Sequence, residues 1–176
     1  MSNMKKYILT AVTLGSIGAV SAGLIGIINM VTRNQIAANA VAKINKGLAE
    51  IYDGASFSDK VDITGDDKYL DCYYVATKDN AQLGYVFQTS GSNMYGKVSM
   101  LVGISNDYTI NRFYLITNEQ TYATTLVDNY IDPFNGGDRE LDDVSCGATY
   151  GAKLVRSMAE EASAWAKDNF GQGGNN

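Results

Sequence analysis

The segment Asp143-Val144-Ser145-Cys146-Gly147-Ala148-Thr149 stands directly before the last helical pattern of the chain. In the next segment, Tyr150–Phe170, apolar residues recur at helical spacing and predict an amphipathic helix. Its apolar face is formed by Leu154, Val155, Met158, Ala162 and Trp165. We therefore expect Thr149 at or just before a helix start, where unpaired N–H groups and the helix dipole stabilise an anion. An ordinary helix cap is the alternative, because Thr, Ser and Asp are common caps.

Upstream of this segment, strand-like runs alternate with turn-forming residues. The runs are Tyr69–Lys78, Leu83–Thr89, Lys97–Ser105 and Thr109–Thr117, and the turns are Lys78-Asp79-Asn80, Ser90-Gly91-Ser92-Asn93 and Asn106-Asp107. Such short links join antiparallel neighbours. We also expect a loop over Asp53–Asp67, a helix over Tyr122–Tyr130 and a break at Asn135-Gly136-Gly137-Asp138. The predicted fold class is α+β, with an antiparallel sheet and flanking helices.

The N-terminal part of the chain has the pattern of a membrane segment. No charged residue occurs between Tyr7 and Val31, and a span needs about 20 apolar residues. A signal peptide is the competing interpretation, because Lys5-Lys6 precedes the apolar run and Val20-Ser21-Ala22 resembles a cleavage site. The run continues past Ala22, which favours a retained anchor. Apolar residues at helical spacing then predict an amphipathic connector over Thr32–Tyr52.

The small residues of the anchor gather on one face of the predicted helix. They are Gly15, Gly18, Ala19, Ala22, Gly23 and Gly26, whereas the opposite face carries Leu14, Ile17, Val20, Leu24, Ile27 and Ile28. Small residues let membrane helices approach closely, although Gly and Ala are also frequent in membrane spans in general. The two-sided order favours a helix that packs within a larger membrane assembly.

Composition excludes several classes of function. The chain contains no His, so Ser-His-Asp and Cys-His catalysis are excluded, as is the commonest metal ligand. A net charge of −5 makes nucleic acid a poor partner. The two cysteines, Cys72 and Cys146, do not form a metal-binding pattern. They either pair outside the cytoplasm or serve as two separate small apolar residues. We predict no catalytic residue and no metal site.

The segment 143–149 resembles the flavinylation motif Asp-x-x-(Ser/Thr)-Gly-Ala-Thr, whose last Thr carries FMN through a phosphoester. Asp143, Gly147, Ala148 and Thr149 match, and Cys146 stands where the family usually has Ser or Thr. The resemblance implies covalent FMN on Thr149, with Ser145, Cys146, Gly147 and Ala148 beside it and Asp143 as the motif acid. We interpret Cys146 as a spacer, because no His is present to activate its thiol.

The whole layout is similar to the RnfG/NqrC family, and most of all to its RnfG branch. Segment 28–36 resembles the junction between span and domain, and segment 95–104 a strand that leads into the sheet. Asn118-Glu119-Gln120-Thr121 occupies the position of a family loop, Glu-Thr-Pro-Gly-Leu-Gly, that lies close to the flavin. Only Glu119 matches, and the Pro and Gly are missing. We take Glu119 and Thr121 as flavin-contact candidates from this comparison and do not extend it to the other residues of 120–126.

The resemblance implies an electron-carrying flavoprotein subunit of a redox-driven, ion-translocating oxidoreductase. Such complexes pass electrons between NADH and ferredoxin or a quinone, coupled to Na⁺ or H⁺ movement. The resemblance thus implies that the partners of this chain are other membrane subunits and a flavin transferase. The expected organisation is a cytoplasmic segment 1–6, a transmembrane helix 7–31, a connector 32–52, an FMN-binding domain 53–170 and a disordered tail 171–176. The charges that flank the span do not decide orientation, whereas the family places its domain on the outer face. The alternatives are a stand-alone extracellular flavin carrier and a non-redox, membrane-anchored scaffolding domain.

Overall fold

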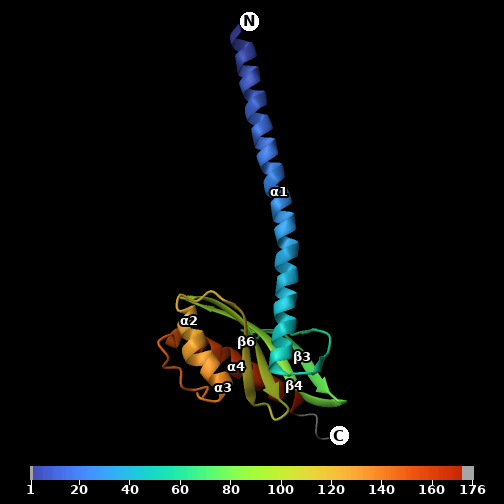
Figure 1. Ribbon diagram of the computed structural model, residues 1–176, viewed down its shortest axis with the longest axis vertical. Coiled ribbons are helices and arrows are strands. Elements are labelled where there is room, and N and C mark those ends of the chain that lie inside the picture. The colour runs from blue at the N-terminus through green and yellow to red at the C-terminus, as the bar shows by residue number, and fades with distance from the viewer. Residues whose placement is uncertain (1, 172–176) are drawn as a thin grey trace. The chain divides into compact units, whose positions relative to one another are not determined.

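A computed structural model describes the backbone of residues 2–171 and the side chains of residues 4–24 and 38–171. The fold is α+β, as predicted: an N-terminal apolar helix, then an antiparallel sheet with flanking helices (Figure 1). The chain divides into two compact units, Met1–Ala42 and Lys43–Asn176. The predicted tail, apart from Gly171, lies outside the described residues.

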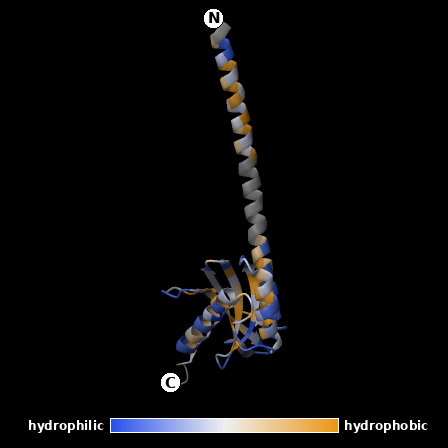
Figure 2. Cartoon of the chain, turned by 90° about the vertical axis from the view of Figure 1, so that its left-hand side faces the viewer, coloured by the Kyte–Doolittle hydropathy of each residue, from blue (hydrophilic) through white to orange (hydrophobic). Residues whose placement is uncertain are grey.

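The predicted membrane segment and connector belong to one continuous helix, α1 (Ser2–Ile51). Within it, Met4–Leu24 is long and apolar enough to cross a membrane, by length and composition (Figure 2). Hydroxyl groups in this stretch donate to the carbonyl four residues earlier; the pairs are Thr10 to Lys6, Thr13 to Leu9 and Ser16 to Val12, at 2.8–3.0 Å. The polar groups are thus paired inside the helix, as a lipid environment requires. The side chains of residues 25–31, and with them Gly26, lie outside the described part.

The second unit is built on an antiparallel sheet in the order β1-β3-β4-β5-β6, with β2 also paired to β3. The strands are β1 (Ser56–Phe57), β2 (Val61–Asp62), β3 (Leu70–Lys78), β4 (Ala81–Asn93), β5 (Gly96–Ser105) and β6 (Ile110–Asn118). The four long strands match the predicted runs. The prediction that 53–67 is entirely loop was wrong, because Ser56 pairs with Thr77 and Val61 with Tyr73.

The predicted turn at Ser90–Asn93 was also wrong, because β4 continues through these residues and turns at Met94 and Tyr95. Turn-forming residues are used here for close packing. A Cβ added at Gly91 would lie 2.9 Å from Leu154 Cδ1 and 3.0 Å from Met158 Sδ, so glycine lets a helix cross the strand closely. The Ser90 hydroxyl donates to Asp71 Oδ2 at 2.7 Å.

Four helical segments complete the unit: α2 (Ala123–Leu126), the π-helical turn η1 (Val127–Ile131), α3 (Asp132–Gly136) and α4 (Thr149–Phe170). The helix predicted at 122–130 therefore contains a π turn, a feature that periodicity does not reveal. Gly137, within the predicted break, ends α3 with φ 81°. The predicted final helix is confirmed, beginning one residue earlier at Thr149.

Apolar side chains cover both faces of the sheet. On one face α4 buries the predicted stripe, Leu154, Val155, Met158 and Ala162, with Trp165 partly buried. On the other face Leu48 and Ile51, from the end of α1, pack with Val86 and Leu101. Cys146 belongs to the first cluster and Cys72 to the second; both are buried and free, so they act as two separate small apolar residues.

Candidate functional site

A cavity of about 250 Å³ opens at the N-terminal end of α4. Its walls come from three segments that are distant in sequence: the β4–β5 turn, residues 120–126 and the motif 147–151. The lining residues are Tyr95, Gln120, Tyr122, Leu126, Gly147, Ala148, Thr149, Tyr150 and Gly151. The C-terminal part of the motif singled out in the sequence thus forms one wall of a cavity.

Thr149 is the first residue of α4 and lines this cavity. The residue in the cap position is Ala148, with φ −118° and ψ 41°, and no side chain caps the helix. The alternative interpretation of Thr149 as an ordinary helix cap was therefore wrong. Among the described side chains, residues 4–24 and 38–171, and the described backbone, its hydroxyl has no hydrogen-bond partner. The first helical bond runs from Ala152 N–H to Ala148 O at 3.0 Å, so the N–H groups of residues 149–151 are free to meet a ligand.

Gly147 gives the motif its bend before the helix. Its φ of 82° lies in the left-handed region, which favours glycine. A Cβ added there would lie 3.2 Å from Thr125 Cγ2, so the position is also crowded. Ala148 is buried, with 6% of its surface exposed. Two small residues therefore place the Thr149 side chain at the cavity while the backbone passes close to α2.

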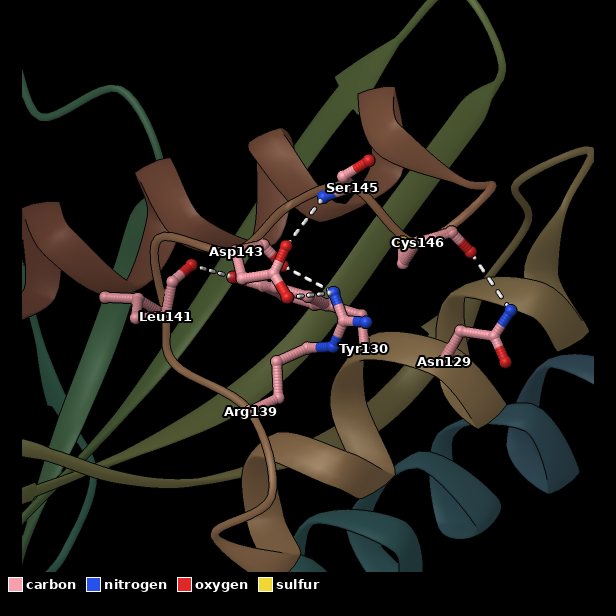
Figure 3. Close-up of polar contacts among 7 residues, drawn as sticks. All are labelled: Asn129, Tyr130, Arg139, Leu141, Asp143, Ser145 and Cys146. Carbon is pink, nitrogen blue, oxygen red and sulfur yellow. Dashed lines mark hydrogen bonds and ion pairs between the residues drawn. The ribbon is translucent and has the colours of Figure 1, made fainter.

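The π-helical turn η1 holds the loop that carries the motif (Figure 3). Asn129 Nδ2 donates to the Cys146 carbonyl at 3.0 Å, and the Tyr130 hydroxyl donates to the Leu141 carbonyl at 2.6 Å. Tyr130 is fully buried, and this desolvation raises the pKa of its phenol above its ordinary value. Because a π turn shifts side chains out of regular helical register, consecutive residues reach two points of one loop.

Asp143, the motif acid, shapes the loop itself. Its Oδ2 lies 3.1 Å from Arg139 Nη1, and the same Arg139 nitrogen donates to the Asp143 carbonyl at 2.7 Å (Figure 3). Asp143 Oδ1 accepts a long bond from the Ser145 N–H at 3.4 Å. No cluster of three or more metal-ligating side chains occurs among the residues that the structure describes.

The other wall of the cavity follows β6. The Glu119 N–H donates to the Lys97 carbonyl and the Thr121 N–H to the Tyr95 carbonyl, both at 2.8 Å. These bonds continue the strand pairing past the end of β6. Gly96, with φ 133°, allows the close approach, because an added Cβ would clash with the Glu119 carbonyl oxygen. Backbone pairing therefore positions this segment.

Gln120 and Asn93 connect this wall to α4. Gln120 Nε2 donates to Asn93 Oδ1 at 3.1 Å and to the Gly96 carbonyl, and Asn93 Nδ2 donates to the Tyr150 carbonyl at 3.0 Å. Asn93 Oδ1 also accepts the Tyr95 N–H at 2.8 Å. The β4–β5 turn, segment 118–121 and the first turn of α4 are thus joined by one polar network.

Three tyrosines surround the opening. The Tyr95 ring centroid lies 5.3 Å from that of Tyr150 and 6.0 Å from that of Tyr122. Tyr122 and Tyr150 are 53% and 58% exposed, so their rings offer aromatic surface to a ligand. The cavity therefore combines free N–H donors and a free hydroxyl with aromatic surfaces, a set suited to an anionic ligand that carries a flat ring.

The structure brings only some of the predicted site residues to the cavity. Thr149, Ala148 and Gly147 line it; Asp143, Ser145, Cys146, Glu119 and Thr121 do not. Cys146 points into the core, consistent with a spacer. Sequence reasoning missed Tyr95, Gln120, Tyr122 and Leu126 as lining residues. Tyr95 and Gln120 lie within the compared segments 95–104 and 118–121, whereas Tyr122 and Leu126 fell in the predicted helix 122–130 and carried no site signal.

No protein-family model matches this chain, and no curated protein matches it.

Proposed function

We propose that this protein is a membrane-anchored flavoprotein in which Thr149 carries FMN through a phosphoester. The observation that carries the proposal is the position of Thr149: an unpaired hydroxyl on the first residue of a long helix, facing a cavity bordered by three tyrosines. The motif resemblance supports the same residue independently of the cavity. Asp143 and Gly147 then act by shaping the loop that presents Thr149.

The chain's residues fit such a group. The free N–H groups of residues 149–151 suit a phosphate, and Lys153, four residues after Thr149, lies on the same helix face and supplies a positive charge. The rings of Tyr95, Tyr122 and Tyr150 offer aromatic surface to a flavin. The cavity volume of about 250 Å³ is just below the ~300–1,000 Å³ of pockets that enclose whole ligands. The cavity therefore suits a flavin that stays partly exposed.

Attachment is a group transfer to the Thr149 hydroxyl. Its oxygen forms a bond to the flavin phosphorus, the phosphoanhydride bond of a flavin dinucleotide breaks, and a nucleoside monophosphate leaves with the electron pair. The hydroxyl proton passes to a base. We propose that a flavin transferase supplies this base, since the chain contains no His. Once bound, FMN supplies one- and two-electron redox chemistry, and the protein supplies position and electrostatics.

We further propose that the chain is the electron-carrying subunit of an Rnf-type complex, one that couples electron transfer between NADH and ferredoxin to Na⁺ or H⁺ movement. The domain then lies on the outer face of the cell membrane, where a covalent bond prevents cofactor loss. The apolar stretch Met4–Leu24 supports membrane attachment. Its face of small residues, which includes Gly15, Gly18 and Gly23, supports packing against other membrane subunits.

The attachment site is tested with Thr149→Val, which keeps the side-chain shape and deletes the hydroxyl. The full-length chain is produced with a flavin transferase and examined by in-gel flavin fluorescence after denaturation and by intact mass. We expect the parent to carry one FMN and Thr149→Val to carry none. Ser145→Ala is the matched control, since it removes the nearest other motif hydroxyl, and it should keep the adduct. An adduct retained in Thr149→Val rejects the assignment.

Membership in a complex is tested separately through the anchor. Gly18→Ile places bulk on the face of small residues, and Leu24→Ile changes the opposite face with little change in volume. We expect Gly18→Ile to lose co-purifying membrane subunits while its flavin content stays equal to that of Leu24→Ile. Equal recovery of partners with both variants would favour the stand-alone flavin carrier.

A further inference from the structure

Gln120 is the most buried polar side chain that lines the cavity, with 7% of its surface exposed. Its amide has a defined orientation. Nε2 faces two acceptors, the Gly96 carbonyl and Asn93 Oδ1. Asn93 Oδ1 is an acceptor because it already takes the Tyr95 N–H. The Gln120 nitrogen must therefore point toward these two oxygens, which leaves Oε1 on the cavity side.

Gln120 Oε1 has no hydrogen-bond donor within residues 2–171. It lies next to the first turn of α4, since a Cβ added at Gly151 would be 3.3 Å from this oxygen and 3.1 Å from Leu126 Cδ2. Glycine at position 151 thus keeps the space in front of Oε1 open. Because no side-chain oxygen or nitrogen of the described residues is both fully buried and unpaired, this oxygen is accessible from the cavity that Gln120 lines. An oriented, accessible acceptor of this kind suits a ligand that brings a donor.

The chemistry of Oε1 restricts which part of a ligand it can meet. An amide carbonyl oxygen can only accept hydrogen bonds. Phosphate oxygens are acceptors too and carry negative charge, so they do not pair with it. A phosphate is therefore directed to the N–H groups of residues 149–151, and a neutral N–H or O–H to Gln120. The cavity thus has one end for an anion and one for an uncharged donor.

We propose that Gln120 Oε1 is a specificity-determining acceptor that takes a hydrogen bond from a neutral donor of the flavin. This inference rests on the proposed function. Two parts of a flavin offer such a donor, the ring N3–H and the ribityl hydroxyls. Both share the chemistry of an uncharged hydrogen-bond donor, and the ligands used in the experiment distinguish them.

The experiment uses the full-length chain, produced without a flavin transferase and purified in detergent. Riboflavin, 3-methylriboflavin and lumiflavin are titrated into the parent and Gln120→Met, with flavin fluorescence as the readout. We expect Gln120→Met to bind riboflavin about 5- to 100-fold more weakly, which is the range for one lost hydrogen bond to a buried group. The flavin that lacks the relevant donor should bind parent and variant equally: 3-methylriboflavin if the donor is N3–H, lumiflavin if it is a ribityl hydroxyl.

The same parent-to-variant ratio for all three flavins, or no binding of riboflavin to the parent, would overturn the inference. Gln82→Met is the matched control, because Gln82 is exposed and bonded to Asn106, and it should bind riboflavin like the parent. If Gln120→Met does not fold, riboflavin bound to the parent reports the contact by NMR as an N3–H or hydroxyl proton protected from exchange. Covalent loading of the same chain with a transferase is measured alongside, so failure of attachment is distinguished from failure of the Gln120 contact.

Discussion

Two of the three segments that border the cavity are held in place by different means. Segment 118–121 continues the pairing of β6 with β5, through backbone bonds from Glu119 to Lys97 and from Thr121 to Tyr95. The motif loop 141–148 has no strand beside it and depends on side chains from η1, mainly Asn129 and Tyr130. Backbone pairing tolerates many side-chain changes, whereas a side-chain support fails when its one polar atom is removed. Segment 118–121 should therefore be sensitive to substitution of Gly96, which contacts it. The loop 141–148 should be sensitive to loss of the side chains that hydrogen-bond to it.

The largest effect is expected from Gly96→Ala, which attacks the strand-held wall at its close contact. Gly96 has a φ of 133°, which side chains rarely adopt, and the new Cβ would clash with the Glu119 carbonyl oxygen. Strain and overpacking together should lower the free energy of unfolding by about 2–5 kcal/mol, measured by urea unfolding of the detergent-solubilised chain. Gly137→Ala is the control, because Gly137 also has a positive φ but nothing within 4 Å. An equal loss in both variants would mean that the contact with Glu119 contributes nothing.

Tyr130→Phe should have the next largest effect, on the loop held by side chains. The change keeps the buried ring and leaves the Leu141 carbonyl without its donor, which should cost about 1–3 kcal/mol. Flavin loading should fall as well, since the loop presents Thr149. Tyr85→Phe serves as the comparison, because Tyr85 is buried and its hydroxyl has no partner within residues 2–171. Unchanged loading in Tyr130→Phe would show that η1 does not position the motif.

Cys146→Ser should have the smallest effect, and it places at position 146 a residue that the similar flavinylation motif allows. Cys146 is 6% exposed and packs in the apolar cluster under α4. Burying a hydroxyl there should lower the free energy of unfolding by about 1 kcal/mol. Flavin loading should match or exceed that of the parent, because the Cys146 contact with Asn129 is made by its backbone carbonyl. A severe loss of loading would mean that the thiol itself takes part.

The elements with clear periodicity could be predicted from sequence. The four long strands and the face of α4 follow directly from runs of apolar residues, such as Leu154, Val155 and Met158. The strands β1 and β2 could not be found, because each has two residues and exists through pairing with β3. Ser90–Asn93 was mistaken for a turn because a packing glycine and a turn glycine look alike in sequence; the contact of Gly91 with α4 separates them.

At the site, the sequence identified the segment that carries Thr149 but not the wall that faces it. Thr149, Gly147 and Ala148 are contiguous, so a motif could locate them. Tyr95, Gln120 and Tyr122 come together through the backbone pairing of Tyr95 and Lys97 with segment 118–121, a tertiary contact with no local pattern. The π turn that aligns Asn129 with Tyr130 is likewise hidden within an ordinary helical period.

The central claim is that Thr149 of the parent chain carries FMN, and peptide mapping tests it most directly. Trypsin cleaves after Arg139 and Lys153, so residues 140–153 form one peptide that contains Thr149, Ser145 and Tyr150. After production with a flavin transferase, this peptide should carry the mass of FMN less one water, and its fragment ions should place the addition on Thr149. An unmodified peptide, or an addition placed on Ser145 or Tyr150, would contradict the account.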